Sequence, residues 1–158
     1  MDTPYSDKIH AIAVNTFEVT CYMFPLEEWE IEEGNHLSQP DDEVRSIVGF
    51  EGAAEGGMVI SPSEELLTAI AANMLGVEAP DEQQKTGALC EITNIICGNT
   101  VPLFAEDQNI CNIQPPRMAE PGEDTDATFE GMNKESLQVL LDEGLVDITV
   151  YYSKMEEA

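Results

Sequence analysis

The sequence predicts an α+β domain of two layers, in which a largely antiparallel sheet packs against helices. Along the chain we expect a helix, a hairpin, two helices, a strand and a second hairpin, an order that lacks the strand–helix alternation of doubly wound folds. A length of 158 residues and a hydrophobic fraction of 42% suit one domain with its own core. We therefore expect residues 1–152 to form a single domain, followed by a short C-terminal tail at 153–158.

The first expected helix runs from Ser6 to about Phe24. Its apolar residues recur at spacings of three and four, which places them on one helical face: Ile9, Ile12, Ala13, Phe17, Cys21 and Phe24. Pro25 and then the acidic stretch 27–33, followed by Gly34, end this pattern. Residues 34–42 are polar and contain a proline, so they predict a loop.

Two strands are expected next, at 43–50 and 57–60. The segment between them, 51–56, holds glycine and acidic residues and predicts a rather long hairpin loop. Glycine favours such a loop because it adopts positive φ without steric cost.

A second helix is expected to begin after Ser61. Ser61 serves as the N-cap, Pro62 suits the first helical position, and Glu64 lies where a capping box requires it. Gly76 fits the position just beyond the end of this helix.

The third helix is expected to open at Asp81, with Gln84 completing a capping box. Its apolar residues continue toward Val101. Pro102 removes a backbone donor and presses on the carbonyl of residue 98, so the helix is expected to kink or fray there.

The remaining segments predict strands. Residues 109–113 form one strand that Pro115 and Pro116 stop, and 119–126 is a polar loop. The runs 136–141 and 145–152 predict the clearest hairpin in the chain, because the second run is rich in β-branched and aromatic residues.

Charge limits the classes of partner. Thirty-two acidic residues against six basic ones give a formal net charge of −26 at pH 7. Nucleic acids and anionic membranes are therefore excluded as expected partners, because both require clustered Lys and Arg. No signal peptide is visible at the start, and no apolar run approaches the roughly 18 residues of a membrane span. The expected location is the cytoplasm.

The cysteines and histidines predict neither a disulfide framework nor a zinc site. Cys21, Cys90, Cys97 and Cys111 form no CxxC pair, and the chain contains two histidines. Free thiols in a reducing compartment are the expectation, and no metal or other cofactor bound by this chain is expected.

The candidate functional residues are Glu91 and Asn94 on the third helix. A spacing of three places them on one face, with Cβ atoms about 5–6 Å apart. The amide can hold a water by donating and accepting hydrogen bonds, and the carboxylate can pair with a cation on a partner. Spacing alone leaves open that the pair is only part of the solvated stripe of an amphipathic helix.

The pattern Glu91-x-x-Asn94-x-x-x-Gly98 resembles the ExxNxxxG core of the CheC/CheX chemotaxis phosphatases. The strand and helix before this pattern, and the strand and hairpin after it, also fit their positions in CheX-like domains, so the resemblance covers about residues 43–152. A single copy of the pattern indicates the CheX branch, since CheC proteins resemble tandem copies. The resemblance implies a CheC-like fold and a homodimer.

Two positions depart from the longer CheC pattern. Gly87 stands four residues before the glutamate, where that pattern has Asp or Ser. Arg117 stands 23 residues after the asparagine, where it has proline, and Pro116 lies one residue short of that place.

The resemblance implies a protein phosphatase acting on the aspartyl phosphate of a CheY-type response regulator, in chemotaxis or two-component signalling. Asn94 would orient the attacking water, Glu91 would pair with the receiver's lysine, and the receiver would supply its own Mg²⁺. Two alternatives stay open: a non-catalytic module that binds a response regulator, and a flagellar-switch or scaffold component.

Overall fold

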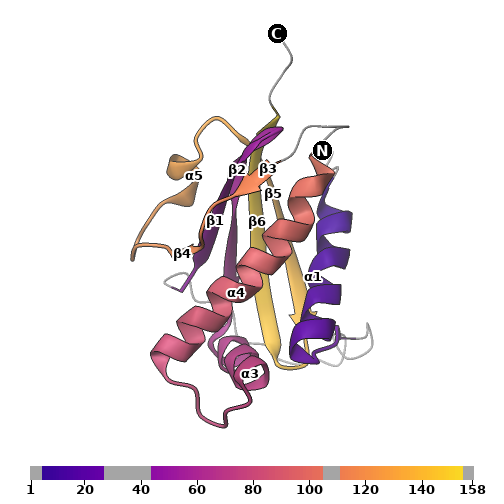
Figure 1. The fold of residues 1–158 in the computed structure, drawn as a ribbon, viewed down its shortest axis with the longest axis vertical. Helices are drawn as coiled ribbons and strands as arrows, with labels where there is room; N and C mark the ends of the chain where they lie inside the picture. Colours follow the sequence, from indigo (N-terminus) through magenta and orange to yellow (C-terminus); the bar gives the residue numbers. More distant parts are fainter. Residues whose placement is uncertain (1–4, 27–43, 105–110, 155–158) are drawn as a thin grey trace.

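Helices cover one face of a six-stranded sheet in the computed structural model, which describes residues 5–26, 44–104 and 111–154 (Figure 1). The covering helices are α1 (Ser6–Cys21), α3 (Glu64–Leu75) and α4 (Glu82–Thr100). The strands are β1 (Ser46–Gly52), β2 (Ala54–Pro62), β3 (Cys111–Ile113), β4 (Arg117–Met118), β5 (Asn133–Leu141) and β6 (Gly144–Lys154). The predicted α+β class with an antiparallel sheet is confirmed.

The sheet has the strand order β3-β1-β2-β6-β5, and β4 also pairs with β1. Every pairing is antiparallel, and β2 pairs with β6 along its whole length, from Ala54↔Lys154 to Pro62↔Val146. The last hairpin of the chain therefore completes the sheet that the first hairpin begins.

Alternation along the strands separates two apolar clusters, because neighbouring side chains point to opposite faces of a sheet. The main cluster joins the helices to one face, and Val48, Ile60 and Ile148 are fully buried in it. The smaller cluster lies on the other face, where Phe129 and Met132 cover Val59 and Tyr151. The core that supports α4 is thus the main cluster.

The first hairpin differs from the prediction. The expected loop at 51–56 is paired strand, with Phe50 opposite Gly56, and only a tight turn separates β1 from β2. Pairing of β2 with β6 on its other side explains the difference, since Gly56 lies opposite Tyr152 and Gly57 opposite Tyr151. Ladder hydrogen bonds on both sides hold these glycines extended, although glycine weakens an isolated strand.

The N-cap of α3 was also predicted two residues too early. Ser61 and Pro62 belong to β2, and the N-cap is Ser63, whose hydroxyl accepts a hydrogen bond from the Leu66 N–H at 3.4 Å. Ser61 lies opposite Asp147 in the sheet, and that pairing extends the strand past the expected helix start. Gly76 is the C-cap with φ 68°, as predicted.

The ends of α1 and α4 follow from local chemistry. Tyr22 ends α1 with φ 58°, so the helix stops before the predicted Phe24. Asp81 and Gln84 form the predicted capping box of α4. After Thr100 the chain tightens into the 3₁₀ helix η1 (Val101–Leu103), which contains Pro102, and the predicted break is confirmed.

The C-terminal third contains two short elements that the sequence did not predict, β4 and the helix α5 (Thr125–Thr128). Asp124 caps α5 by accepting from the backbone N–H of Asp126 and Ala127, within the expected polar loop. The final hairpin is confirmed, but β5 begins before the predicted residue 136 and β6 continues past the predicted residue 152. The acidic stretch 27–33, the loop 34–42 and residues 109–110 lie outside the described residues.

A buried carboxylate joins α1 to the sheet. Glu135 on β5 is 3% exposed, and its oxygens accept hydrogen bonds from the Tyr5 N–H (3.0 Å), the Ser6 hydroxyl (2.8 Å) and the Tyr152 hydroxyl (2.6 Å). No side chain caps α1 locally, so Glu135 supplies both the missing acceptor and a favourable negative charge at the helix N-terminus.

Two buried thiols make the free energy of unfolding depend on pH in the alkaline range. The four cysteines are free, and burial raises the pKa of Cys21 and of Cys97 from about 9 to about 12. Between these values the unfolded chain loses the two protons and the folded chain keeps them. The free energy of unfolding therefore falls as pH rises above 9, by about 1.4 kcal/mol per pH unit for each thiol.

Urea unfolding at intervals between pH 8 and 11 measures this dependence. We expect the Cys21→Ala/Cys97→Ala variant to show a shallower decline above pH 9 than the wild type. A decline of equal slope in both proteins would contradict the assignment to the thiols.

Candidate functional site

Helix α4 turns an apolar face to the sheet and a polar stripe away from it. Its fully buried residues include Leu89, Ile92 and Ile96, all within the main core cluster. At 100° per residue, Gly87, Glu91, Asn94 and Gly98 fall within about 60° of one another and opposite that buried face. The stripe is about 16 Å long, and the helix that carries it, α4, lies in the foreground of Figure 1.

Glu91 and Asn94 share this stripe, as predicted from their spacing. Glu91 is exposed and Asn94 is half-buried. Neither side chain forms a hydrogen bond or an ion pair with another described residue. The carboxylate and the amide are therefore available to water or to a partner.

Three cations of the chain are already paired with carboxylates elsewhere. Lys85 contacts Glu64 at 3.0 Å, Arg117 contacts Glu123 at 2.9 Å, and Lys134 contacts Asp126 at 2.8 Å. The hydrogen bond from Arg117 is the largest cause that lowers the pKa of Glu123 to about 2. None of these cations neutralises Glu91, so Glu91 can pair with a cation that another molecule provides.

Packing against the described residues does not require the two glycines of the stripe. A Cβ built on Gly87 would meet none of their atoms within 4 Å, and one on Gly98 would meet the Ile113 Cδ1 at 3.8 Å, an ordinary contact. They leave the helix surface low on both sides of Glu91 and Asn94, which lets another surface approach the pair closely.

This geometry predicts that Gly87→Ala stabilises the protein. Alanine has the higher helix propensity and has room here, so we expect the free energy of unfolding to rise by about 1 kcal/mol and Tm by about 2–4 °C. Gly76→Ala is the matched control, because Gly76 also has open space but has φ 68°, and it should lower Tm. A lower Tm for Gly87→Ala would contradict the prediction.

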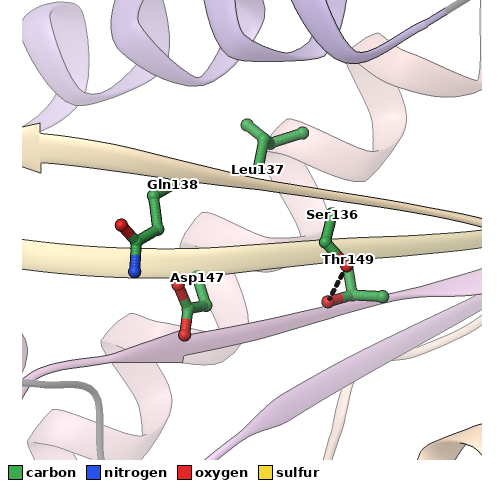
Figure 2. A pocket seen from close by; sticks show the side chains of 5 residues that line it. All are labelled: Ser136, Leu137, Gln138, Asp147 and Thr149. Carbon is green, nitrogen blue, oxygen red and sulfur yellow. Dashed lines mark hydrogen bonds between the residues drawn. The ribbon is translucent and has the colours of Figure 1, made fainter. Parts of the chain in front are cut away.

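A hollow of about 430 Å³ lies on the opposite face of the sheet, over β5 and β6. Figure 2 shows Gln138 and Asp147 pointing off this face, Leu137 pointing the other way, and the Ser136 and Thr149 hydroxyls 3.3 Å apart. Neither Glu91 nor Asn94 lines this hollow. Small substrates generally bind in concave sites, whereas the candidate pair projects from a convex helix, which favours docking of another protein.

Metal ligation and membrane insertion find no support in the described residues. They contain no group of three or more His, Cys, Asp or Glu side chains placed to hold a metal ion. Within the same residues, no helix is both long and apolar enough to cross a membrane.

The fold and the outward stripe of α4 together describe an α+β domain whose Glu91 and Asn94 side chains are available to another molecule. A family model described as "Chemotaxis phosphatase CheX" matches residues 44–135, more than half of the chain and all of α4. The chain therefore belongs to the CheX family of chemotaxis phosphatases. The enzymes of this family are phosphatases that act on phosphorylated CheY.

Solved structures share the fold at low sequence identity. One is from the CheX–CheY–BeF₃–Mg²⁺ complex of Borrelia burgdorferi, with 19% identity, a TM-score of 0.69, and coverage of 97% of this chain and 100% of the matched chain. Another is the chemotaxis protein CheX of Vibrio vulnificus, with 19% identity, a TM-score of 0.70, and coverage of 96% and 97%.

A third such structure is CheX of a Desulfovibrio desulfuricans subspecies, with 15% identity, a TM-score of 0.67, and coverage of 94% and 98%. The comparison with curated proteins finds no match.

One feature beside the site was not predicted. Thr93, between Glu91 and Asn94, is fully buried, and its hydroxyl bonds to the hydroxyl of Ser46 on β1. The two residues lie 47 positions apart, and no local pattern pairs a buried threonine with a distant serine.

Proposed function

We propose that this chain hydrolyses the aspartyl phosphate of a CheY-type receiver domain and that Glu91 and Asn94 are its working pair. The observation that carries the proposal is the availability of both side chains on the outward stripe of α4, inside the region that matches the CheX family. A rigid helix mounted on a sheet suits this task, because its side chains keep a fixed spacing when it docks.

In the proposed complex α4 lies against the receiver's active site. The Asn94 amide binds one water and directs its oxygen toward phosphorus, opposite the bond to the receiver's aspartate. A P–O bond forms to the water and the P–O bond to the aspartate breaks. Inorganic phosphate leaves with the water oxygen, the aspartate becomes a carboxylate, and the proton of the attacking water passes to phosphate or solvent.

Glu91 is proposed to dock the two proteins. Its exposed carboxylate forms no ion pair with a cation among the described residues, so a lysine near the receiver's phosphoryl group can pair with it. The Mg²⁺ is proposed to come with the receiver, as the composition of the B. burgdorferi complex suggests, and it neutralises charge on the phosphoryl oxygens. No cofactor bound by this chain enters the proposal.

Residues 1–152 are proposed to work as one domain in the cytoplasm, where receiver domains of two-component signalling act. A homodimer is proposed through β5, the edge strand of the sheet. Along Asn133–Val139 this strand pairs only with β6 among the described residues, which leaves backbone groups for a second copy. Sedimentation at several concentrations tests this, and a single species of monomer mass would refute it.

The decisive experiment measures phosphate release from a panel of phosphorylated CheY-type receivers in Mg²⁺. Each receiver is assayed alone, with the wild-type chain, and with the Glu91→Ala/Asn94→Ala variant, and binding is measured in parallel. We expect at least one receiver to lose phosphate faster with the wild type and not with the variant.

The same experiment distinguishes the alternative function. A receiver that binds the wild-type chain and keeps its phosphate as long as the receiver alone would identify a non-catalytic binding module. A receiver that loses phosphate equally fast with wild type and variant would establish a phosphatase and remove Glu91 and Asn94 from its mechanism.

A further inference from the structure

A pair of buried hydroxyls fixes α4 to the sheet immediately beneath the candidate site. Thr93 and Ser46 are both 0% exposed, and their side-chain oxygens are in hydrogen-bonding contact. The Thr93 hydroxyl donates to the Leu89 carbonyl at 2.8 Å, so its single proton is already used. Ser46 must therefore be the donor to Thr93, which gives this contact a defined direction.

The rest of the helix–sheet contact is much less directional. The buried residues of α4 beside Thr93 are Leu89, Ile92 and Ile96, whose dispersion contacts fill the core but carry no preferred bond direction. Among the described residues, the other polar side-chain contact between α4 and the sheet is that of the Cys90 thiol with the Met118 sulfur at 3.8 Å, which is weak. The Ser46–Thr93 bond thus adds a directional polar constraint to the apolar packing that holds α4 on the sheet.

Ser46 is a rigid attachment point for this bond. Its backbone lies opposite Ile60 of β2 on one side and opposite Met118 of β4 on the other. A strand held on both sides moves little, so the hydroxyl of Ser46 marks a fixed position on the sheet for the helix above it.

A small rotation of α4 has a large effect at the tips of the side chains. Side-chain atoms lie about 5–6 Å from a helix axis, so a rotation of about 10° moves them by about 1 Å. A misplacement of about 1 Å in a reacting arrangement costs roughly a hundredfold in rate. Thr93 lies next to Asn94 in the chain, so such a rotation acts directly on the amide that holds the water.

We propose that Thr93 and Ser46 are positioning residues that set the rotation of α4 and thereby aim the Asn94 amide along the line of attack. This inference rests on the proposed phosphatase function and adds two residues to its machinery. Neither hydroxyl touches the substrate, because both are buried beneath the helix.

The test compares Thr93→Val with Thr100→Val. Thr100 is also 0% exposed on α4 and donates to the carbonyl four residues earlier at 2.8 Å, but it has no hydrogen-bond partner in the sheet among the described residues. With a receiver found in the panel, we expect Thr93→Val to lower kcat by about ten- to a hundredfold and to change KM by less than about threefold. Thr100→Val should lower kcat by less than about twofold. Equal kcat losses in the two variants would overturn the inference.

The Ser46→Ala/Thr93→Val variant separates positioning from folding. Replacing both partners by apolar groups leaves no buried donor unpaired, so its urea midpoint should lie closer to that of the wild type than the midpoint of Thr93→Val. Its kcat should stay as low as that of Thr93→Val, and Thr93→Ser should retain most of the wild-type kcat. A double variant that regains kcat together with stability would refute positioning.

An orientation measurement tests separately from catalysis whether Thr93 and Ser46 fix the orientation of α4. Residual dipolar couplings of the α4 amides report how the helix is oriented relative to the sheet. We expect them to change in Thr93→Val and to stay unchanged in Thr100→Val. Unchanged couplings in Thr93→Val would overturn the inference whether or not the wild type is active, whereas an inactive wild type with changed couplings would overturn the phosphatase function and leave Thr93 and Ser46 as residues that only orient α4.

Discussion

Alanine at Asn94 is expected to reduce the acceleration of phosphate loss by about a hundredfold and to leave binding of the receiver within about threefold. The amide is proposed to orient one water, and losing that orientation raises the barrier of the chemical step. The substitution leaves the main core intact, because Asn94 lies half-buried on the outward stripe of α4 and is not among its fully buried residues. Phosphate release at a saturating concentration of this chain measures the first effect, and affinity for a receiver loaded with beryllium fluoride measures the second.

Asn99→Ala is the matched control for this prediction. Asn99 is an exposed asparagine five residues further along α4, about 140° around the helix from Asn94. We expect its substitution to change neither quantity by more than about twofold. Equal loss of rate in both variants would show that the amide of Asn94 has no special role, and loss of binding in Asn94→Ala would mean that this residue docks the receiver.

Loss of Glu135 is expected to destabilise the fold by about 3–5 kcal/mol, the largest stability effect that we predict for a single substitution. Glu135→Ala removes a 3%-exposed carboxylate and leaves the Tyr5 N–H, the Ser6 hydroxyl and the Tyr152 hydroxyl without their acceptor. It also removes the negative charge at the start of α1. Urea unfolding at neutral pH measures the change.

Tyr152→Phe separates one of these bonds from the rest. It deletes a single hydroxyl and keeps the ring, which packs at 5.0 Å from Phe104 and 5.2 Å from Tyr5. We expect a loss of about 1 kcal/mol for this variant. A loss as large as that of Glu135→Ala would place the stabilisation in the Tyr152 bond alone and would contradict a role for Glu135 at the start of α1.

The sequence predicted those features whose signals are local. The capping box of Asp81 and Gln84, the C-cap at Gly76 and the break at Pro102 each depend on residues within a single turn, and the structure has all three. The placement of Glu91 and Asn94 on one face of α4 follows from helical periodicity alone. Their catalytic roles stay a prediction.

Features that depend on distant pairing were predicted wrongly or not at all. Gly56 and Ser61 lie in β2 because β6 pairs with them, although the local pattern of glycines and a capping serine favours a loop and a helix start. The bonds of Glu135 to Ser6 and of Thr93 to Ser46 join residues 129 and 47 positions apart. Nothing in the neighbourhood of any of these residues specifies the partner.

The position of β6 between β2 and β5 affects the order in which the protein can fold. Until the segment beyond Asn133 has been synthesised, β2 has an unpaired edge and α1 lacks the carboxylate that caps it. The N-terminal helix and the first hairpin therefore cannot reach their native arrangement during translation of residues 1–132. Pairing across such sequence distances is slow and exposes apolar strand edges meanwhile, so the nascent chain is most vulnerable to aggregation just before its last hairpin is complete.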